Sequence, residues 1–86
     1  MAIAYVLINS DLGSDETIIS EAKDILSGQP EIQYEIQGVY GVFDVVLKLI
    51  SEDAANLRSV ITNKIRRIHQ VQSTLTMMVI DEQEKP

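Results

Sequence analysis

Two short apolar segments limit the possible folds of this chain more than any other feature. Ile3–Asn9 (IAYVLIN) and Phe43–Ile50 (FDVVLKLI) carry apolar side chains at almost every position, so neither segment has a clearly polar face. Runs of this kind predict strands that are covered on both faces and therefore lie in the middle of a sheet.

Two further segments are predicted to be strands. Glu31–Val39 alternates strictly between apolar and polar side chains, so one of its faces is expected to contact water. Val71–Ile80 (VQSTLTMMVI) is rich in β-branched residues, which favour strands. Alternation along this last segment places Ser73 on one face and Thr74 and Thr76 on the other.

The segments between these strands have helical periodicity. Ser14 is positioned to cap a first helix, which Gly28 and Pro30 end. A second helix is predicted to begin at Ser51–Asp53. The buried stripes are predicted from the spacing of apolar residues: Ile18, Ile19, Ala22, Ile25 and Leu26 in the first helix, and Leu57, Val60, Ile61, Ile65 and Ile68 in the second.

The order of these elements predicts an α+β, ferredoxin-like βαββαβ fold. Two right-handed crossovers with a hairpin between them give an antiparallel four-stranded sheet with two helices on one face. In this topology the first and third strands are central, which agrees with their apolar composition. We expect residues 1–81 to form a single domain and residues 82–86 to be a charged C-terminal tail.

A domain of this size needs support beyond its own core. The chain has 86 residues and no cysteine, so disulfides cannot provide that support, and oligomerisation is the remaining route. The helices cover only one face of the sheet. We predict that Ala4, Val6, Ile8, Val46 and Ile50 place apolar groups on the open face, and that this face packs against a second copy in a two-fold, barrel-like α/β dimer.

Charge and motifs argue against several classes of function. With seven basic against thirteen acidic residues, the chain is not expected to bind DNA directly, and Lys64, Arg66 and Arg67 are predicted to be the solvated last turn of a helix. No segment resembles a targeting signal or a membrane span, so a cytoplasmic location is expected. A single histidine, His69, and no catalytic or nucleotide-binding motif predict a protein that is not an enzyme and needs no metal or cofactor.

The segment from Gly38 to Asp44 (GVYGVFD) is the most informative part of the chain for a binding site. Glycines permit unusual backbone angles on both sides of Tyr40. Asp44 interrupts an otherwise apolar strand, and a carboxylate in such a place needs a partner. One interpretation is that it accepts backbone N–H groups and holds the turn; the other is that it receives an ammonium group of a ligand.

These residues resemble the ligand-binding (RAM) domain of the leucine-responsive regulator/AsnC (Lrp/AsnC) family of transcription regulators. The stretch GVYGVFDVVLKL, a helix, VQSTLTMMVI and the opening AYVLIN fit this family over about Ile3 to Asp81. The resemblance implies a homodimer joined through its sheets, assembly of dimers into a closed ring such as an octamer, and a small effector, typically an amino acid. The effector-binding residues that it implies are Val39, Tyr40, Gly41, Asp44, Ser73, Thr74 and Thr76.

Regulators of this family carry an N-terminal helix-turn-helix domain, whereas this sequence begins at its first strand. We therefore expect a stand-alone effector domain that senses an amino acid, or that co-assembles with a full-length Lrp/AsnC regulator and so modulates transcription. Two other interpretations remain open. One is a small dimeric α+β barrel enzyme of the cofactor-free oxygenase or isomerase type. The other is an ACT-like regulatory domain, whose ligand site lies nearer to Asn9–Gly13.

Overall fold

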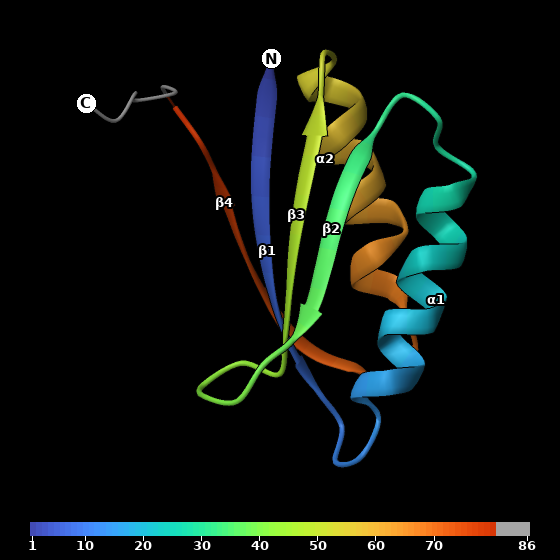
Figure 1. Cartoon of the computed structure of the whole chain (residues 1–86), viewed down its shortest axis with the longest axis vertical. Helices are drawn as coiled ribbons and strands as arrows, with labels where there is room; N and C mark the ends of the chain where they lie inside the picture. Colours follow the sequence, from blue (N-terminus) through green and yellow to red (C-terminus); the bar gives the residue numbers. More distant parts are fainter. Residues whose placement is uncertain (81–86) are drawn as a thin grey trace.

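The computed structural model describes residues 1–80; the predicted tail (82–86) and Asp81 lie outside the described residues. The elements follow the predicted order (Figure 1). They are β1 (Ala2–Ser10), α1 (Asp15–Ser27), β2 (Gln33–Gly38), β3 (Val45–Ser51), α2 (Ala54–Asn63), the 3-10 turn η1 (Ile65–Arg67) and β4 (Val71–Met78). This order confirms the predicted α+β, ferredoxin-like fold.

The four strands form one sheet in the order β2-β3-β1-β4. All three strand pairs are antiparallel, and the apolar strands β1 and β3 are central, as predicted. Figure 1 shows α1 and α2 on the same side of this sheet. The other side, which we call the open face, has no helix over it in the part of the chain that the structure describes.

The side chains of β1 lie on the opposite faces of the sheet from those predicted. Ala4, Val6 and Ile8 were expected on the open face, but all three are fully buried on the helix-covered side. There they pair with Leu49, Leu47 and Val45, which are equally buried. Of the five residues predicted for the open face, Val46 and Ile50 lie there, and Ala4, Val6 and Ile8 do not.

The reason for this error lies in the register between the two central strands. β1 is apolar on both faces, so alternation alone does not say which face the helices cover. Tyr5 pairs with Lys48, and a lysine cannot be buried beneath helices without a partner. The pairing therefore turns the Tyr5 face outward. The apolar side chains of β1 and β3 on the open face are Ile3, Tyr5, Leu7, Val46 and Ile50.

The helices cover the core largely as predicted, but the predicted cap of the first helix is not formed. The stripe of α2 and η1 is confirmed: Leu57, Val60, Ile61, Ile65 and Ile68 are all buried. Asp53 caps α2, because its carboxylate accepts hydrogen bonds from the backbone N–H groups of Ala55 (3.0 Å) and Asn56 (3.1 Å). Ser14 precedes α1 but makes no side-chain cap hydrogen bond, so that part of the prediction is wrong.

Candidate functional site

Three polar residues lie side by side at one end of the sheet, and we call them the polar row: Asp44, Asn9 and Ser73. Asp44 precedes β3, and its backbone N–H donates to the carbonyl of Ile8 (2.9 Å), which continues the ladder between β3 and β1. Asn9 on β1 is paired with Ser73 on β4, and its Nδ2 donates to Ser73 Oγ (3.2 Å). Residues far apart in the sequence thus meet where three strands end.

The Asp44 carboxylate holds this end of the sheet together. Its Oδ2 accepts hydrogen bonds from the backbone N–H (2.9 Å) and the hydroxyl (3.2 Å) of Ser10. The Asp44 carbonyl accepts a further bond from the N–H of Val39 (2.8 Å), which closes the loop between β2 and β3. Asp44 therefore has the turn-holding role that the sequence allowed, and the side-chain hydrogen bonds within residues 1–80 engage only one of its two carboxylate oxygens.

The loop between β2 and β3 presents apolar side chains to solvent. Tyr40 and Val42 are almost fully exposed and Val39 is partly exposed, although all three are large apolar residues. Figure 1 shows this loop projecting beyond the lower end of the sheet. Gly41 has a φ of +149°, a backbone angle that side-chain-bearing residues rarely adopt. Beside it, Asp15, Gly38, Val39 and Tyr40 line a depression of about 300 Å³.

The residues predicted from the last strand do not all reach this loop. Ser73 belongs to the polar row, but Thr74 and Thr76 pair with Ile8 and Val6 and so lie on the helix-covered side. The structure therefore brings Val39, Tyr40, Gly41, Asp44 and Ser73 to one end of the sheet and separates Thr76 from them.

Asn9 and Ser10 connect Asp44 to Ser73 through hydrogen bonds, but neither was among the effector-binding residues predicted for this family; the sequence placed them only near the ligand site of the ACT-like alternative. The signal was present: an Asn-Ser pair ends an otherwise apolar strand. Polar residues at a strand end point to hydrogen bonding at that end of the sheet, but they do not name their partner.

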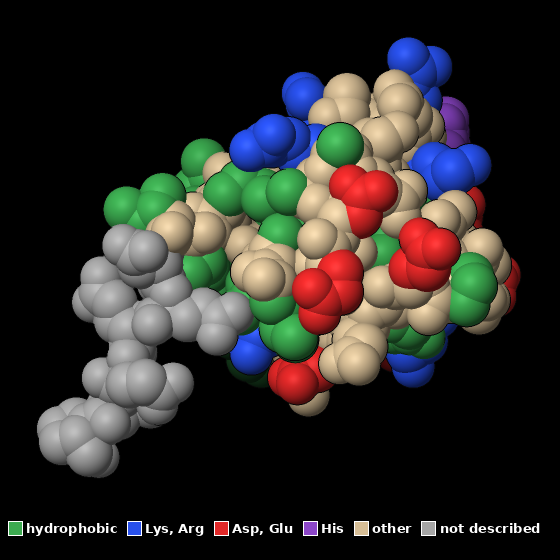
Figure 2. All heavy atoms as spheres, turned by 90° about the horizontal axis from the view of Figure 1, so that it is seen from above, with side chains coloured by type: hydrophobic (Ala, Val, Ile, Leu, Met, Phe, Trp, Pro, Cys, Tyr) green, Lys and Arg blue, Asp and Glu red, His purple; other side chains and the backbone are tan. Residues whose placement is uncertain are grey.

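The open face carries an extended apolar surface. β1 and β3 contribute Ile3, Tyr5, Leu7, Val46 and Ile50, and β4 adds Leu75 and Met77, which pair with Leu7 and Tyr5. Leu75 is 48% exposed and Met77 is 45% exposed. The charged Lys48 lies over the Tyr5 ring, with Nζ 5.8 Å from the ring centroid. Figure 2 shows that hydrophobic side chains gather on one side of the molecule, whereas acidic side chains lie mostly on another.

Within residues 1–80, no group of three or more His, Cys, Asp or Glu side chains is placed to hold a metal ion. None of the helices in that range is long and apolar enough to cross a membrane.

The structure is thus that of a small ferredoxin-like α+β domain with an open apolar face and an exposed loop. The family model of the Lrp/AsnC ligand binding domain matches residues 3–85. The chain therefore belongs to this family, as its resemblance predicted. Domains of this family are typical of regulatory, non-enzymatic proteins.

Solved structures of the same fold include a small protein and longer regulators. FFRP-DM1 is 30% identical, with a TM-score of 0.75, and the match covers 93% of this chain and all of that one (100%). AsnC from E. coli is 20% identical, with a TM-score of 0.76 over 99% of this chain and 54% of that chain. The transcriptional regulator NMB0573 from Neisseria meningitidis, solved in complex with L-Met, is 15% identical, with a TM-score of 0.70 over 98% of this chain and 53% of that chain.

This chain thus spans about half the length of the two longer regulators and the full length of FFRP-DM1. None of the curated proteins matches it.

Proposed function

We propose that this domain is an amino-acid-responsive assembly module that carries out no catalysis. The observation that carries the proposal is the end of the sheet where the exposed loop of Val39, Tyr40 and Gly41 adjoins the polar row. The domain would influence transcription by sensing an effector, or by co-assembling with a longer regulator of its family. Residues 1–81 would act in this as one unit.

Assembly would begin with a two-fold dimer through the open face. Monomeric proteins rarely leave a continuous apolar patch of this kind in water, and such patches commonly mark protein interfaces. The same surface on a second copy is self-complementary under two-fold symmetry. Dimers would then associate further into a ring, with the exposed loops at the contacts between them.

The effector site would lie at the loop and the polar row. An amino acid needs an acceptor for its ammonium group and donors for its carboxylate. The second carboxylate oxygen of Asp44 can accept from an ammonium group, and the Ser73 hydroxyl can donate to a carboxylate. A neighbouring dimer would supply the remaining contacts and cover Tyr40. The L-Met complex of NMB0573 supports an amino acid as the class of ligand.

Binding between dimers would couple the ligand to the oligomeric state. A ligand shifts an equilibrium only by the difference between its affinities for the two states. If the site is complete only when two dimers meet, the ligand stabilises the larger assembly.

The test combines light scattering after size exclusion with calorimetry against the twenty amino acids. We expect a mass distribution that shifts with one or a few of them. Tyr40→Ala should abolish that shift and weaken binding while leaving the fold intact, because Tyr40 is fully exposed. Leu12→Ala is the matched variant, since Leu12 is equally exposed in the loop between β1 and α1.

The two variants also separate the competing interpretations. Binding that is lost in Leu12→Ala and retained in Tyr40→Ala would place the ligand at the first strand-to-helix loop, as in an ACT-like domain, and would overturn the proposed site. An assembly that is indifferent to all twenty amino acids would refute amino-acid sensing and leave co-assembly with a longer regulator to be tested by subunit exchange.

A further inference from the structure

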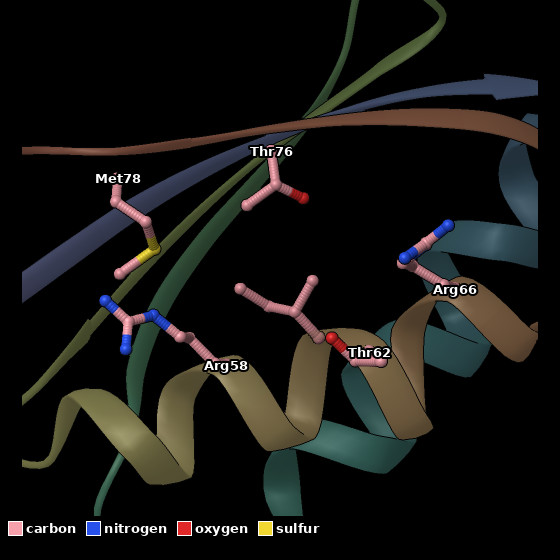
Figure 3. Close-up of a pocket in the computed structure, with 6 residues that line it drawn as sticks. Arg58, Thr62, Arg66, Thr76 and Met78 are labelled. Atoms are coloured by element: carbon pink, nitrogen blue, oxygen red, sulfur yellow. The ribbon is translucent and has the colours of Figure 1, made fainter.

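A groove lies between β4 and α2, on the helix-covered side of the sheet and away from the loop and the polar row. It measures about 220 Å³ and is lined by Arg58, Ile61, Thr62, Arg66, Thr76 and Met78. Figure 3 shows Thr76 and Met78 extending from β4 toward α2, with Arg58 beneath Met78 and Arg66 at the opposite end. None of the residues that line this groove belongs to the amino-acid site proposed above; Thr76, which was predicted from the sequence for that site, lies here instead.

The groove exists because α2 covers the central strands and not the edge strand. On this side of the sheet, Ala4 and Val6 of β1 are fully buried, whereas their partners on β4, Met78 and Thr76, remain partly or largely exposed. Arg58, Thr62 and Arg66 are four residues apart, so they share one side of α2 and its 3-10 continuation. The side of the helix that faces the uncovered strand is therefore the side that carries the guanidinium groups.

The charge of this groove is opposite to that of the protein. The chain has a net charge of −6, yet two of its seven basic side chains line the groove. None of the described residues that line it is an Asp or Glu. Among residues 1–80, the hydrogen bonds of side chains involve neither Arg58 nor Arg66. Within the part of the chain that the structure describes, both guanidinium groups can therefore contact an anion in the groove.

The shape and lining indicate the chemical class of that anion. Guanidinium groups bind carboxylates through paired, charge-assisted hydrogen bonds, and Thr62 and Thr76 add two hydroxyl groups. Ile61 and Met78 provide an apolar floor that suits a short aliphatic chain. The volume lies below the roughly 300–1,000 Å³ of sites for drug-sized ligands, so the ligand is small. Among residues 1–80, the lining offers no acid to receive an ammonium group, and the two guanidinium groups repel such a group.

We infer that the α2–β4 groove is a second ligand site, which takes small aliphatic carboxylates that lack an amino group. This site is independent of the proposed amino-acid site, because it lies on the other side of the sheet and uses different residues. The domain would then bind two related classes of ligand at separate sites: amino acids at one, and carboxylates without an amino group at the other.

The test is an NMR titration of the isotope-labelled protein with 3-methylbutanoate as the probe. We expect saturable shifts of the backbone amides of Thr62, Thr76 and Met78, weakened by added NaCl because salt screens the charges. Arg58→Gln and Arg66→Gln should each weaken binding about three- to ten-fold, as expected for an exposed charge-assisted contact. Arg67→Gln is the matched control, because Arg67 is an exposed neighbour in η1 that does not line the groove.

Three further probes test each part of the inference. 3-Methylbutan-1-ol has the same shape without the charge, leucine adds the ammonium group, and inorganic phosphate has the charge without the aliphatic chain. All three should shift the groove amides less than 3-methylbutanoate does. Phosphate that binds as tightly as the probe would overturn the aliphatic part of the inference, and leucine that does so would overturn the exclusion of the amine.

Other outcomes would overturn the site itself. These are shifts confined to the loop around Tyr40, an absence of saturable shifts, or an equal loss of binding in Arg67→Gln. Spectra that are otherwise unchanged in the variants establish that they remain folded. Failure here leaves the amino-acid site untouched, since that site is measured through Tyr40 and the mass of the assembly.

Discussion

The contribution of the open face to assembly can be estimated from two exposed residues of β4. Burying a Leu or Met side chain completely contributes about 1.5–3 kcal/mol relative to exposure. Leu75 is 48% exposed and Met77 is 45% exposed. Covering this exposed part in a dimer therefore contributes about 0.7–1.5 kcal/mol for each side chain. In a two-fold dimer each residue is buried twice, so Leu75→Ala combined with Met77→Ala removes about 3–6 kcal/mol.

This loss corresponds to a dimer Kd raised roughly 10²- to 10⁴-fold, at about 1.4 kcal/mol per tenfold change. Sedimentation equilibrium over a range of concentrations measures that Kd, and circular dichroism checks that the double variant remains folded. Leu12→Ala is the control, because it truncates a fully exposed leucine that lies outside the open face. A wild-type protein that is monomeric at tens of micromolar, or a double variant with an unchanged Kd, would refute the reasoning.

Three further predictions concern the stability of the domain, measured as the free energy of unfolding in urea. Asp53→Ala should cost about 0.5–2 kcal/mol because it removes the cap of α2, whereas Ser14→Ala, which removes no cap hydrogen bond, should cost much less; equal losses would contradict the assignment of the caps. Leu47→Ala should cost about 2–5 kcal/mol because Leu47 is fully buried at the centre of the sheet, and a loss below about 1 kcal/mol would mean that this site is not packed as described. Asp44→Ala should cost about 1–3 kcal/mol because it leaves two donors of Ser10 without their acceptor, and unchanged stability would remove Asp44 from its turn-holding role.

The topology was predictable because the hydrophobic pattern of the strands and the rules for connecting them point to the same strand order. The apolar strands β1 and β3 are central, and the alternating segment that became β2 is an edge strand. Short connections and right-handed crossovers then leave one arrangement for two helices. The boundaries shifted by one or two residues at most strand ends, which is where hydrogen bonding rather than hydropathy decides.

The phase of β1 was not predictable from its own residues. Ile3, Tyr5 and Leu7 are as apolar as Ala4, Val6 and Ile8, so both assignments satisfy the pattern of the strand. The decision comes from register, and register depends on a residue 43 positions away, because Tyr5 pairs with Lys48. The hydrophobic pattern of a segment shows which of its faces can be buried, but it does not show which residues of another strand it pairs with.

The candidate site was partly predictable for a similar reason. The glycines and Tyr40 mark the loop locally, so the end of the sheet that carries it was identified. Alternation along β4 predicts that Ser73 and Thr76 lie on different faces of the strand. Which of these faces lies under the helices depends on long-range packing. Arg66 was predicted to be a solvated helix end, and it does lie at the surface; its position in a groove depends on how far β4 extends past α2.

Uneven polarity across the open face connects assembly to the proposed effector site. Apolar side chains lie on β1, β3 and β4, whereas β2 contributes Gln33, Glu35 and Gln37, all exposed, to the same side. In the dimer that we propose, the contact would therefore centre on β1 and β4, because charged residues are costly to bury at an interface core. β2 and the loop that follows it would then remain outside the dimer contact. That loop carries Tyr40, so the surface left free by the first step of assembly is the surface on which a ligand could control the second.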